Sequence, residues 1–281
     1  MEQVLSTARP PTINTYGFLW SHRADHAVQL LIEHGYREFE VMLQPPHLEL
    51  DPLCAAASGL ASMVKDGTIR LQALNMPSLD QNLASPFPEM RAYTRELFIR
   101  QIRLAGAIGV EKVVMAPGRI SPLFPAPREL LEQWLLEAVE ALLPVAAEEG
   151  VALAIENLPI AALPRAADIL DFLRRVGPNP HLRVCYDVAN AHFIGEDPLA
   201  GIQLLRNHLA IIHFSDTGKQ VWRHDVIGTG EIAFSPICDL LAELGWNGPL
   251  VLEIIAKDQN ATDAIRHSHR ALCGSRHKFG L

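Results

Sequence analysis

Cysteine is scarce in this sequence of 281 residues. The four that occur, Cys54, Cys185, Cys238 and Cys273, lie far apart and form no CxxC pair. Disulfide frameworks and thiolate zinc sites both require more closely or regularly spaced cysteines, so neither is expected. We predict that the four thiols act as small buried hydrophobic groups.

Long apolar runs are also missing. A membrane-spanning helix takes about 20 predominantly apolar residues, and no run approaches that length. The amino-terminal segment MEQVLSTARPPTIN has neither the basic start nor the continuous apolar stretch of a signal peptide. These absences predict a cytoplasmic protein without a membrane partner.

An excess of positive charge is absent as well. Lys and Arg total 24 against 32 Asp and Glu, which gives a formal net charge of -8. Proteins that bind nucleic acids neutralise the phosphate backbone with clustered Lys and Arg, so we expect no nucleic-acid partner. A small neutral or carbonyl substrate suits this charge balance better.

No low-complexity segment or charge block marks a second domain. The chain is 49% hydrophobic and therefore able to bury a large core. A (β/α)₈ barrel typically needs about 250 residues. Length and composition therefore predict one domain over residues 1–281.

The sequence contains eight strand candidates, and the last four are rich in Val, Ile and Leu with almost no polar alternation, as expected of strands buried on both faces of a parallel sheet. The eight candidates cover residues 13–19, 39–43, 71–75, 112–116, 151–156, 182–187, 209–213 and 249–253. Amphipathic stretches at 25–35, 93–109, 128–143 and 165–177 predict helices between them. The alternation of strands with helices along the chain predicts an α/β fold, a single (β/α)₈ TIM barrel. An open doubly wound sheet has the same alternation, but it would hold the strand ends described next in a row.

Four of these runs end in a metal-ligand residue type, at Glu156, Asp187, His213 and Glu253. The carboxyl ends of parallel strands converge at one mouth of a barrel. At a separation of about 5 Å, each pair of these carboxylates repels by about 3 kcal/mol at an effective dielectric near 20. Three such pairs sum to a free energy comparable to the stability of a domain, so a positive charge must lie between them. We predict one divalent cation, and the mixed donor set allows Mn, Co, Mg or Zn.

The motifs IENLP, YDVANAHF, IIHFSDTG, RHDVIGTGEI and LVLEI occur in this order. The ordered set resembles the xylose isomerase-like TIM-barrel superfamily, which includes sugar isomerases and epimerases, inosose dehydratases and an apurinic-site endonuclease branch. The resemblance implies that Glu156, Asp187, His213 and Glu253 hold one divalent metal. It also implies that Glu156 and Glu253 face each other across the substrate, and it suggests a dimer or tetramer.

The sequence departs from the endonuclease branch at four positions. Asn75, Ala116 and Asn190 stand where that branch places His ligands, and Trp222 stands where it places an Asp. A three-metal cluster therefore lacks its ligands. Together with the acidic net charge, this disfavours endonuclease activity.

A one-metal site with two glutamates suits proton transfer beside a carbonyl group. A metal on the carbonyl oxygen stabilises the negative charge that develops when the neighbouring proton leaves. Glu156 and Glu253 could then remove and return the proton, so we predict an isomerase or epimerase that turns over a small polyhydroxy ketone or aldehyde through an enediolate. The alternative is a dehydratase or lyase that acts on a cyclic polyol ketone or keto-glycoside. A barrel that binds a sugar without turnover remains a third hypothesis.

Further candidates could contact substrate hydroxyl groups. The resemblance places His224 over the site, although a solvated loop histidine has the same sequence appearance. Tyr16 lies near the end of the first apolar run, and its alternative role is to fill the core. Lys257 follows the last apolar run and could reach the barrel mouth. The candidate substrate-binding residues are His224, Asp216, Arg223, His192, Asn190, Glu40 and Tyr16.

Overall fold

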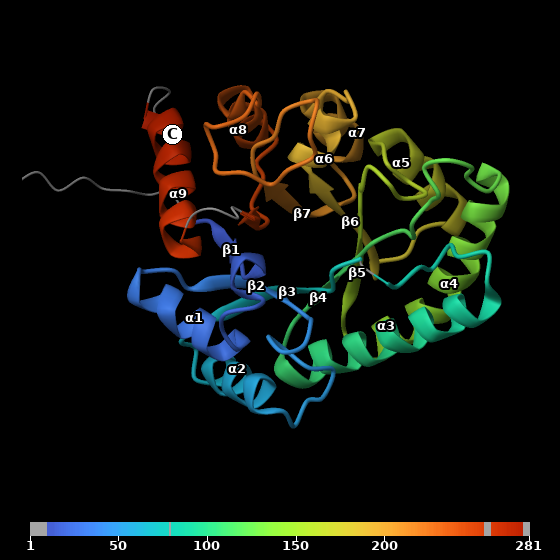
Figure 1. The fold of residues 1–281 in the computed structure, drawn as a ribbon, viewed down its shortest axis with the longest axis horizontal. Helices are drawn as coiled ribbons and strands as arrows, with labels where there is room; N and C mark the ends of the chain where they lie inside the picture. The colour runs from blue at the N-terminus through green and yellow to red at the C-terminus, as the bar shows by residue number, and fades with distance from the viewer. Residues whose placement is uncertain (1–9, 79, 256–259, 278–281) are drawn as a thin grey trace, which may run out of the picture.

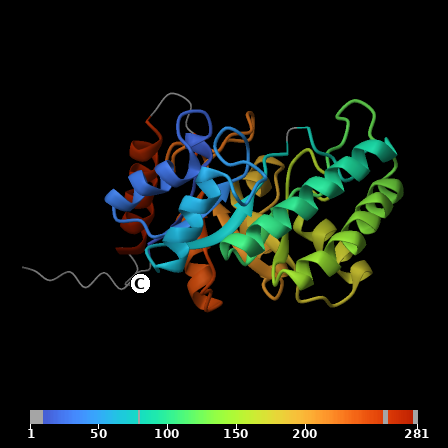
Figure 2. The same cartoon turned by 90° about the horizontal axis from the view of Figure 1, so that it is seen from below.

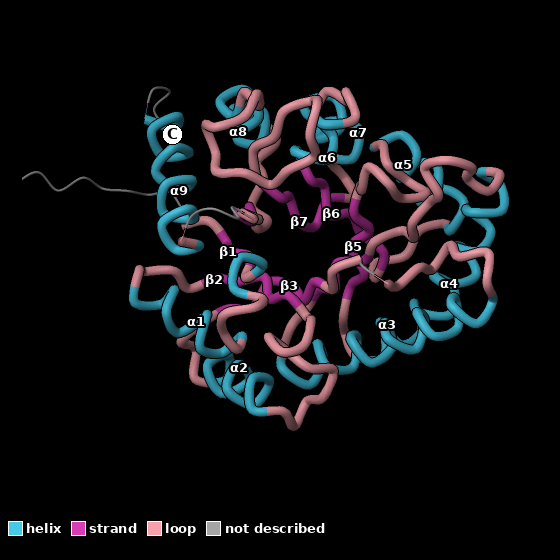
Figure 3. The backbone as a smooth tube through the Cα atoms, in the orientation of Figure 1, coloured by secondary structure: helices cyan, strands magenta, loops and turns pink. Residues whose placement is uncertain are grey.

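The computed structural model describes residues 10–78, 80–255 and 260–277. Within these residues eight parallel strands close into one barrel in chain order, and helices surround it (Figures 1 and 3). The strands are β1 (Thr12–Asn14), β2 (Glu38–Met42), β3 (Arg70–Asn75), β4 (Lys112–Met115), β5 (Ala152–Glu156), β6 (Leu182–Asp187), β7 (Leu209–Phe214) and β8 (Leu250–Leu252). The predicted (β/α)₈ barrel is therefore confirmed.

The helices cover the outside of the barrel. They are α1 (Ala24–Glu33), α2 (Ala55–Lys65), α3 (Pro88–Ile108), α4 (Arg128–Glu148), α5 (Ala166–Val176), α6 (Val188–Phe193), α7 (Pro198–Leu205), α8 (Phe234–Glu243) and α9 (Ala261–His277). The two long helices α3 and α4 lie side by side (Figure 2). Gly109 ends α3 with a φ of 78°, a left-handed conformation that glycine adopts without steric cost.

The first strand is shorter than predicted. The prediction of a strand over 13–19 is wrong beyond Asn14, because Tyr16–Phe18 form a 3₁₀ turn. The side-chain Oδ1 of Asn14 accepts a hydrogen bond from the Tyr16 backbone N–H at 2.7 Å. The Phe18 N–H then donates to the carbonyl of Thr15 at 3.0 Å. Local side-chain hydrogen bonding thus competes with strand extension and turns the chain at the barrel mouth.

The interior of the barrel is layered by the two-residue period of its strands. An apolar cluster separate from the main core is formed by Ala73, Val114, Ala154, Cys185, Ile211 and Val251. Two residues later along the same strands come the ligand-type strand ends of β5, β6, β7 and β8. The polar strand ends therefore lie one layer above a small apolar plug.

The cysteines are free thiols. Cys185 and Cys238 are buried as predicted, whereas Cys54 and Cys273 are partly exposed. Cys54 precedes α2, and its Sγ accepts a hydrogen bond from the Ala57 backbone N–H. Over the part of the chain that the structure describes, no helix combines the length and apolar character needed to cross a membrane.

Candidate metal centre at the barrel mouth

The four ligand-type strand ends meet at the carboxyl end of the barrel. Each offers one ligand atom, and these atoms all lie within 4.8 Å of one another. Asp187 and His213 are completely buried, and Glu156 and Glu253 expose only 6% and 4% of their surface. Asp187 and His213 are direct partners in the parallel pairing of β6 and β7. The barrel thus brings together side chains that are up to 97 residues apart along the chain.

Two ligand atoms at the centre of this cluster have no hydrogen-bond partner. They are Oδ2 of Asp187 and Nδ1 of His213, both buried. The His213 Nδ1 lies 3.4 Å from Glu156 Oε1, 3.4 Å from Glu253 Oε2 and 3.8 Å from Asp187 Oδ2. Unpaired buried polar atoms are costly, and a cation among these four atoms would satisfy both. Three carboxylates and one imidazole therefore fit a divalent metal ion.

The pKa shifts of the clustered side chains also indicate that the carboxylates require compensating positive charge. Burial raises the pKa of Glu156 to about 7, and burial also raises the pKa of Asp187. Burial disfavours the charged form of His224, but Asp187 and Glu253 outweigh it and raise its pKa to about 9. For Glu253, the neighbouring His213 and His224 outweigh burial and lower the carboxyl pKa. The cluster compensates its carboxylates with protons, and a bound cation would displace such protons.

Cys185 lies directly beneath this cluster. Its thiol belongs, with Glu156 and His213, to a second group whose candidate ligand atoms lie within 4.8 Å of one another. Burial raises the pKa of the Cys185 thiol well above its usual value. Metals bind the thiolate, so this neutral thiol is a poorer ligand than the carboxylate of Asp187. We assign Cys185 to the apolar plug.

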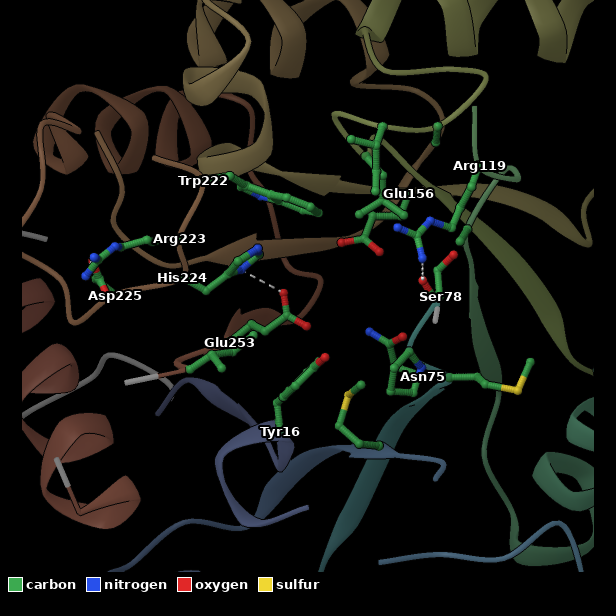
Figure 4. Close-up of a pocket in the computed structure, with 18 of the residues that line it drawn as sticks. Tyr16, Asn75, Ser78, Arg119, Glu156, Trp222, Arg223, His224, Asp225 and Glu253 are labelled. Carbon is green, nitrogen blue, oxygen red and sulfur yellow. Dashed lines mark hydrogen bonds and ion pairs between the residues drawn. The ribbon is translucent and has the colours of Figure 1, made fainter. Parts of the chain in front are cut away.

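A cavity of about 790 Å³ opens above the cluster. Glu156 and Glu253 project into it together with Tyr16, Asn75 and Trp222 (Figure 4). Its remaining wall is largely apolar, with Leu158 and Ile160 among the residues of the loop after β5. A polar floor below apolar walls is the usual character of a small-molecule site.

Three of the candidate substrate-binding residues line this cavity, namely Tyr16, Arg223 and His224. The His224 Nδ1 lies 3.1 Å from Glu253 Oε2 and 3.7 Å from Asp187 Oδ2 (Figure 4). Burial, followed by the charges of Glu253 and Glu156, raises the pKa of Tyr16. Its phenol therefore remains a hydrogen-bond donor at neutral pH.

Asp216 is fully buried and organises the loop that carries His224. Its Oδ1 accepts hydrogen bonds from the backbone N–H groups of Thr217 at 2.9 Å and Ile232 at 3.2 Å. Its Oδ2 accepts from Gly228 at 2.8 Å. A Cβ at Gly230 would lie only 2.4 Å from Asp216 Oδ1, so the loop needs glycine there. Asp216 therefore does not line the cavity and shapes it from behind.

The other three candidates also lie outside the cavity wall. The Nε2 of His192 lies 3.8 Å from Oε2 of Glu231. The Oε2 of Glu40 lies 3.0 Å from Nε2 of His213. Asn190 is fully buried, and its Oδ1 accepts the indole N–H of Trp222 at 2.7 Å. Asn190 also donates its backbone N–H to Asp187 Oδ1 at 2.8 Å. It links a cluster carboxylate to the cavity wall.

Sequence reasoning missed several residues of the cavity wall, among them Asn75, Trp222 and Arg119. Trp222 was noted only as a departure from a ligand pattern, yet its ring borders the cavity and stacks on Phe193 at a centroid distance of 6.4 Å. Arg119 lies on the wall, where its Nη1 donates to the carbonyl of Ser78 at 3.2 Å (Figure 4). The Pro- and Gly-rich segment after β4 was the available signal for Arg119. Lys257 lies outside the described residues.

Residues 28–273 match the family model described as xylose isomerase-like TIM barrel, so the chain belongs to this family. The resemblance drawn from the ordered motifs is thereby confirmed. The closed parallel barrel described above agrees with this membership.

Among curated relatives, the chain is 23% identical over 247 residues to "D-psicose 3-epimerase" of Ruminiclostridium cellulolyticum, a match that covers 83% of this chain and 79% of the relative. It is also 23% identical over 176 residues to "Probable endonuclease 4" of Acholeplasma laidlawii. That match spans 57% of this chain and only 59% of the relative's length.

Solved structures show the same fold. A D-tagatose 3-epimerase-like protein superimposes with a TM-score of 0.83 at 20% identity, covering 96% of this chain and 98% of that one. An L-ribulose 3-epimerase gives a TM-score of 0.78 at 20% identity, with 98% of both chains covered. A 3-keto-D-glucoside 4-epimerase from E. coli gives 0.77 at 14% identity, covering 95% and 98%.

Proposed function

We propose that this protein is a divalent-metal-dependent sugar epimerase or isomerase. The observation that carries the proposal is the buried cluster of Glu156, Asp187, His213 and Glu253, with two unpaired ligand atoms, at the floor of a cavity. The epimerases named among the relatives and the solved structures support a carbohydrate substrate. The sequence prediction and the geometry lead to the same proposal.

Glu156, Asp187, His213 and Glu253 would hold the ion. When bound, a divalent cation polarises a carbonyl oxygen and stabilises the negative charge that develops as the neighbouring proton leaves. The donor set of three carboxylates and one imidazole accommodates Mn, Co, Mg or Zn, with manganese as one candidate. Metal identity follows availability as well as affinity.

Glu156 and Glu253 are the proposed acid and base. Both carboxylates face the cavity, so a substrate carbon between them could lose its proton to one and regain a proton from the other. Inversion at that carbon is epimerisation, and transfer to the adjacent carbon is aldose–ketose exchange. His224 and Tyr16 would donate hydrogen bonds to substrate hydroxyl groups, and the exposed Arg223 also borders the cavity.

Dehydration is the alternative outcome at the same site. If a hydroxyl left from the carbon next to the deprotonated one, the substrate would lose water and form a double bond between the two carbons, as expected for an inosose or a keto-glycoside substrate. A homodimer or homotetramer and a cytoplasmic location remain predictions from the sequence.

The proposal is tested by incubating the protein with Mn²⁺ or Co²⁺ and a panel of ketoses, aldoses and inososes in D₂O. An epimerase or isomerase incorporates solvent deuterium at a substrate carbon and forms a new isomer, both visible by NMR. Loss of the mass of water identifies the dehydratase instead. A metal-loaded protein that exchanges no proton in any of these sugars would contradict both.

Trp222 is expected to stack against an apolar face of the sugar ring. Trp222→Ala should raise KM by about 2–10-fold with little change in kcat, since an aromatic contact is worth about 0.5–1.5 kcal/mol. Trp222→Phe keeps an aromatic ring, so its KM should lie between those of the parent and Trp222→Ala. Trp20→Ala, at a tryptophan that is 76% exposed, is the matched control. An unchanged KM in Trp222→Ala would contradict the stacking role.

A further inference from the structure

Glu40 is a fully buried carboxylate on β2 that does not reach the cavity. Its Oε2 lies 3.0 Å from Nε2 of His213. The other ring nitrogen, Nδ1, faces the carboxylates of Glu156, Asp187 and Glu253. The two nitrogens of one imidazole therefore point to two different acidic environments.

The chemistry of the ring assigns these two sides different tasks. An ionised carboxylate can only accept hydrogen bonds, so Nε2 of His213 must carry the proton that it donates to Glu40. A neutral imidazole has one N–H, which leaves the lone pair of Nδ1 free for a metal. Rotating the ring by half a turn would place carbon atoms where the two nitrogens now lie and break the bond to Glu40.

Glu40 is itself held firmly. Its Oε1 accepts hydrogen bonds from Asn14 Nδ2 at 2.7 Å and from Asn75 Nδ2 at 2.9 Å. The amide of Asn14 cannot turn over without loss, because its Oδ1 accepts the Tyr16 N–H. These donors come from β1 and β3, on either side of β2 in the barrel. Strands on both sides thus fix the carboxylate that orients the His213 ring.

The network also reaches a second proposed ligand. Asn14 Nδ2 lies 3.3 Å from Oε1 of Glu253 as well as 2.7 Å from Oε1 of Glu40. One amide therefore contacts both the carboxylate behind His213 and the carboxylate beside it. No other acidic side chain of the described residues is paired with Nε2 of His213.

We propose that Glu40 is a positioning residue. It holds the His213 ring with Nε2–H directed at Glu40 and Nδ1 directed at the carboxylates of Glu156, Asp187 and Glu253. The sequence had made Glu40 a candidate substrate contact, whereas its contacts run to His213, Asn14 and Asn75. This inference rests on the metal site of the proposed function. Outer partners of a metal-binding histidine fix its tautomer and raise metal affinity.

The first experiment needs no variant. Protein labelled with ¹⁵N-histidine is loaded with ¹¹³Cd²⁺, and the ¹¹³Cd–¹⁵N coupling identifies the nitrogen that binds the ion. Coupling to His213 Nδ1, with a proton on Nε2, is the expected result. Coupling to Nε2 would overturn the inference while leaving the metal site standing.

The second experiment compares Mn²⁺ dissociation constants, measured by calorimetry, for the parent, Glu40→Gln and Glu40→Ala. Glutamine at position 40 would present its NH₂ either to the amide donors of Asn14 and Asn75 or to Nε2–H of His213, so a hydrogen bond is lost in either orientation without a change in shape. We expect Mn²⁺ binding weakened by about 10–100-fold in both variants. The control is Glu38→Gln on the same strand, where the native carboxylate accepts from Gln72 Nε2 at 2.7 Å.

The outcomes separate the two proposals. No metal uptake by the parent would overturn the metal-dependent function and this inference with it. Parent-like Mn²⁺ affinity in a folded Glu40→Ala, or an equal loss in Glu38→Gln, would overturn the positioning role alone. If circular dichroism shows that the Glu40 variants do not fold, the ¹¹³Cd–¹⁵N coupling in the parent decides.

Discussion

Glu253→Ala is expected to abolish both the bound divalent metal and nearly all turnover. The change removes a proposed ligand whose Oε2 lies 3.4 Å from His213 Nδ1, and it removes the carboxylate that lies 3.1 Å from His224 Nδ1. Lewis-acid stabilisation is worth several kcal/mol, and each 1.36 kcal/mol is tenfold in rate, so kcat should fall by about 1,000-fold or more. Elemental analysis of purified protein counts metal per chain, and circular dichroism checks the fold.

The matched control is Glu231→Ala, which removes an exposed carboxylate from the loop that carries His224. It should bind as much metal as the parent. We expect about one metal per chain in the parent and a clear loss in Glu253→Ala. A parent that binds no metal, even after incubation with Mn²⁺ or Co²⁺, would reject the metal centre and the enzymatic proposal that depends on it.

Glu156→Gln should lose proton transfer while the protein stays folded. Glutamine preserves the shape of the side chain and one ligand oxygen but cannot accept the substrate proton. General acid–base catalysis typically contributes about 10²–10⁴-fold, so deuterium exchange into the substrate should fall by that factor. NMR of the substrate in D₂O measures the exchange, and metal analysis of the same sample separates lost catalysis from lost metal.

The isosteric change at the other glutamate provides the comparison. Glu253→Gln should show the same loss, because epimerisation needs both a base and an acid. If both variants exchange substrate protons at the parent rate with metal bound, the acid and base assignment is wrong. Exchange that survives in one variant only would identify the glutamate that is dispensable for removing the proton.

The barrel itself was predictable from the sequence because its signals are local and repeated. Eight apolar runs separated by amphipathic helices correspond to the eight strands, although the first run was extended too far. The error at Tyr16–Phe18 arose because the hydrogen bond from Tyr16 N–H to Asn14 Oδ1 turns the chain there. Apolar composition cannot report such a turn.

The convergence of the four ligand-type strand ends was predictable for a related reason. In a parallel barrel each strand ends at the same mouth, so Glu156, Asp187 and His213 had to converge once their runs were identified as strands. The roles of Asp216 and Glu40 were not predictable in this way. Asp216 binds backbone N–H groups up to 16 residues away, and Glu40 meets a histidine 173 residues away.

By itself, the sequence determined the strand order, the two-residue period that turns each ligand-type strand end inward, and the gathering of three carboxylates and one histidine at the barrel mouth. Those properties follow from chain connectivity and local backbone geometry. Only the tertiary structure decided which nitrogen of His213 faces the carboxylates. It also decided that Asn190 holds Trp222 at the cavity wall through a hydrogen bond, and that Asp216 organises the loop that carries His224. These features depend on hydrogen bonds between segments that meet only when the barrel closes. The residues adjacent in sequence therefore do not reveal them.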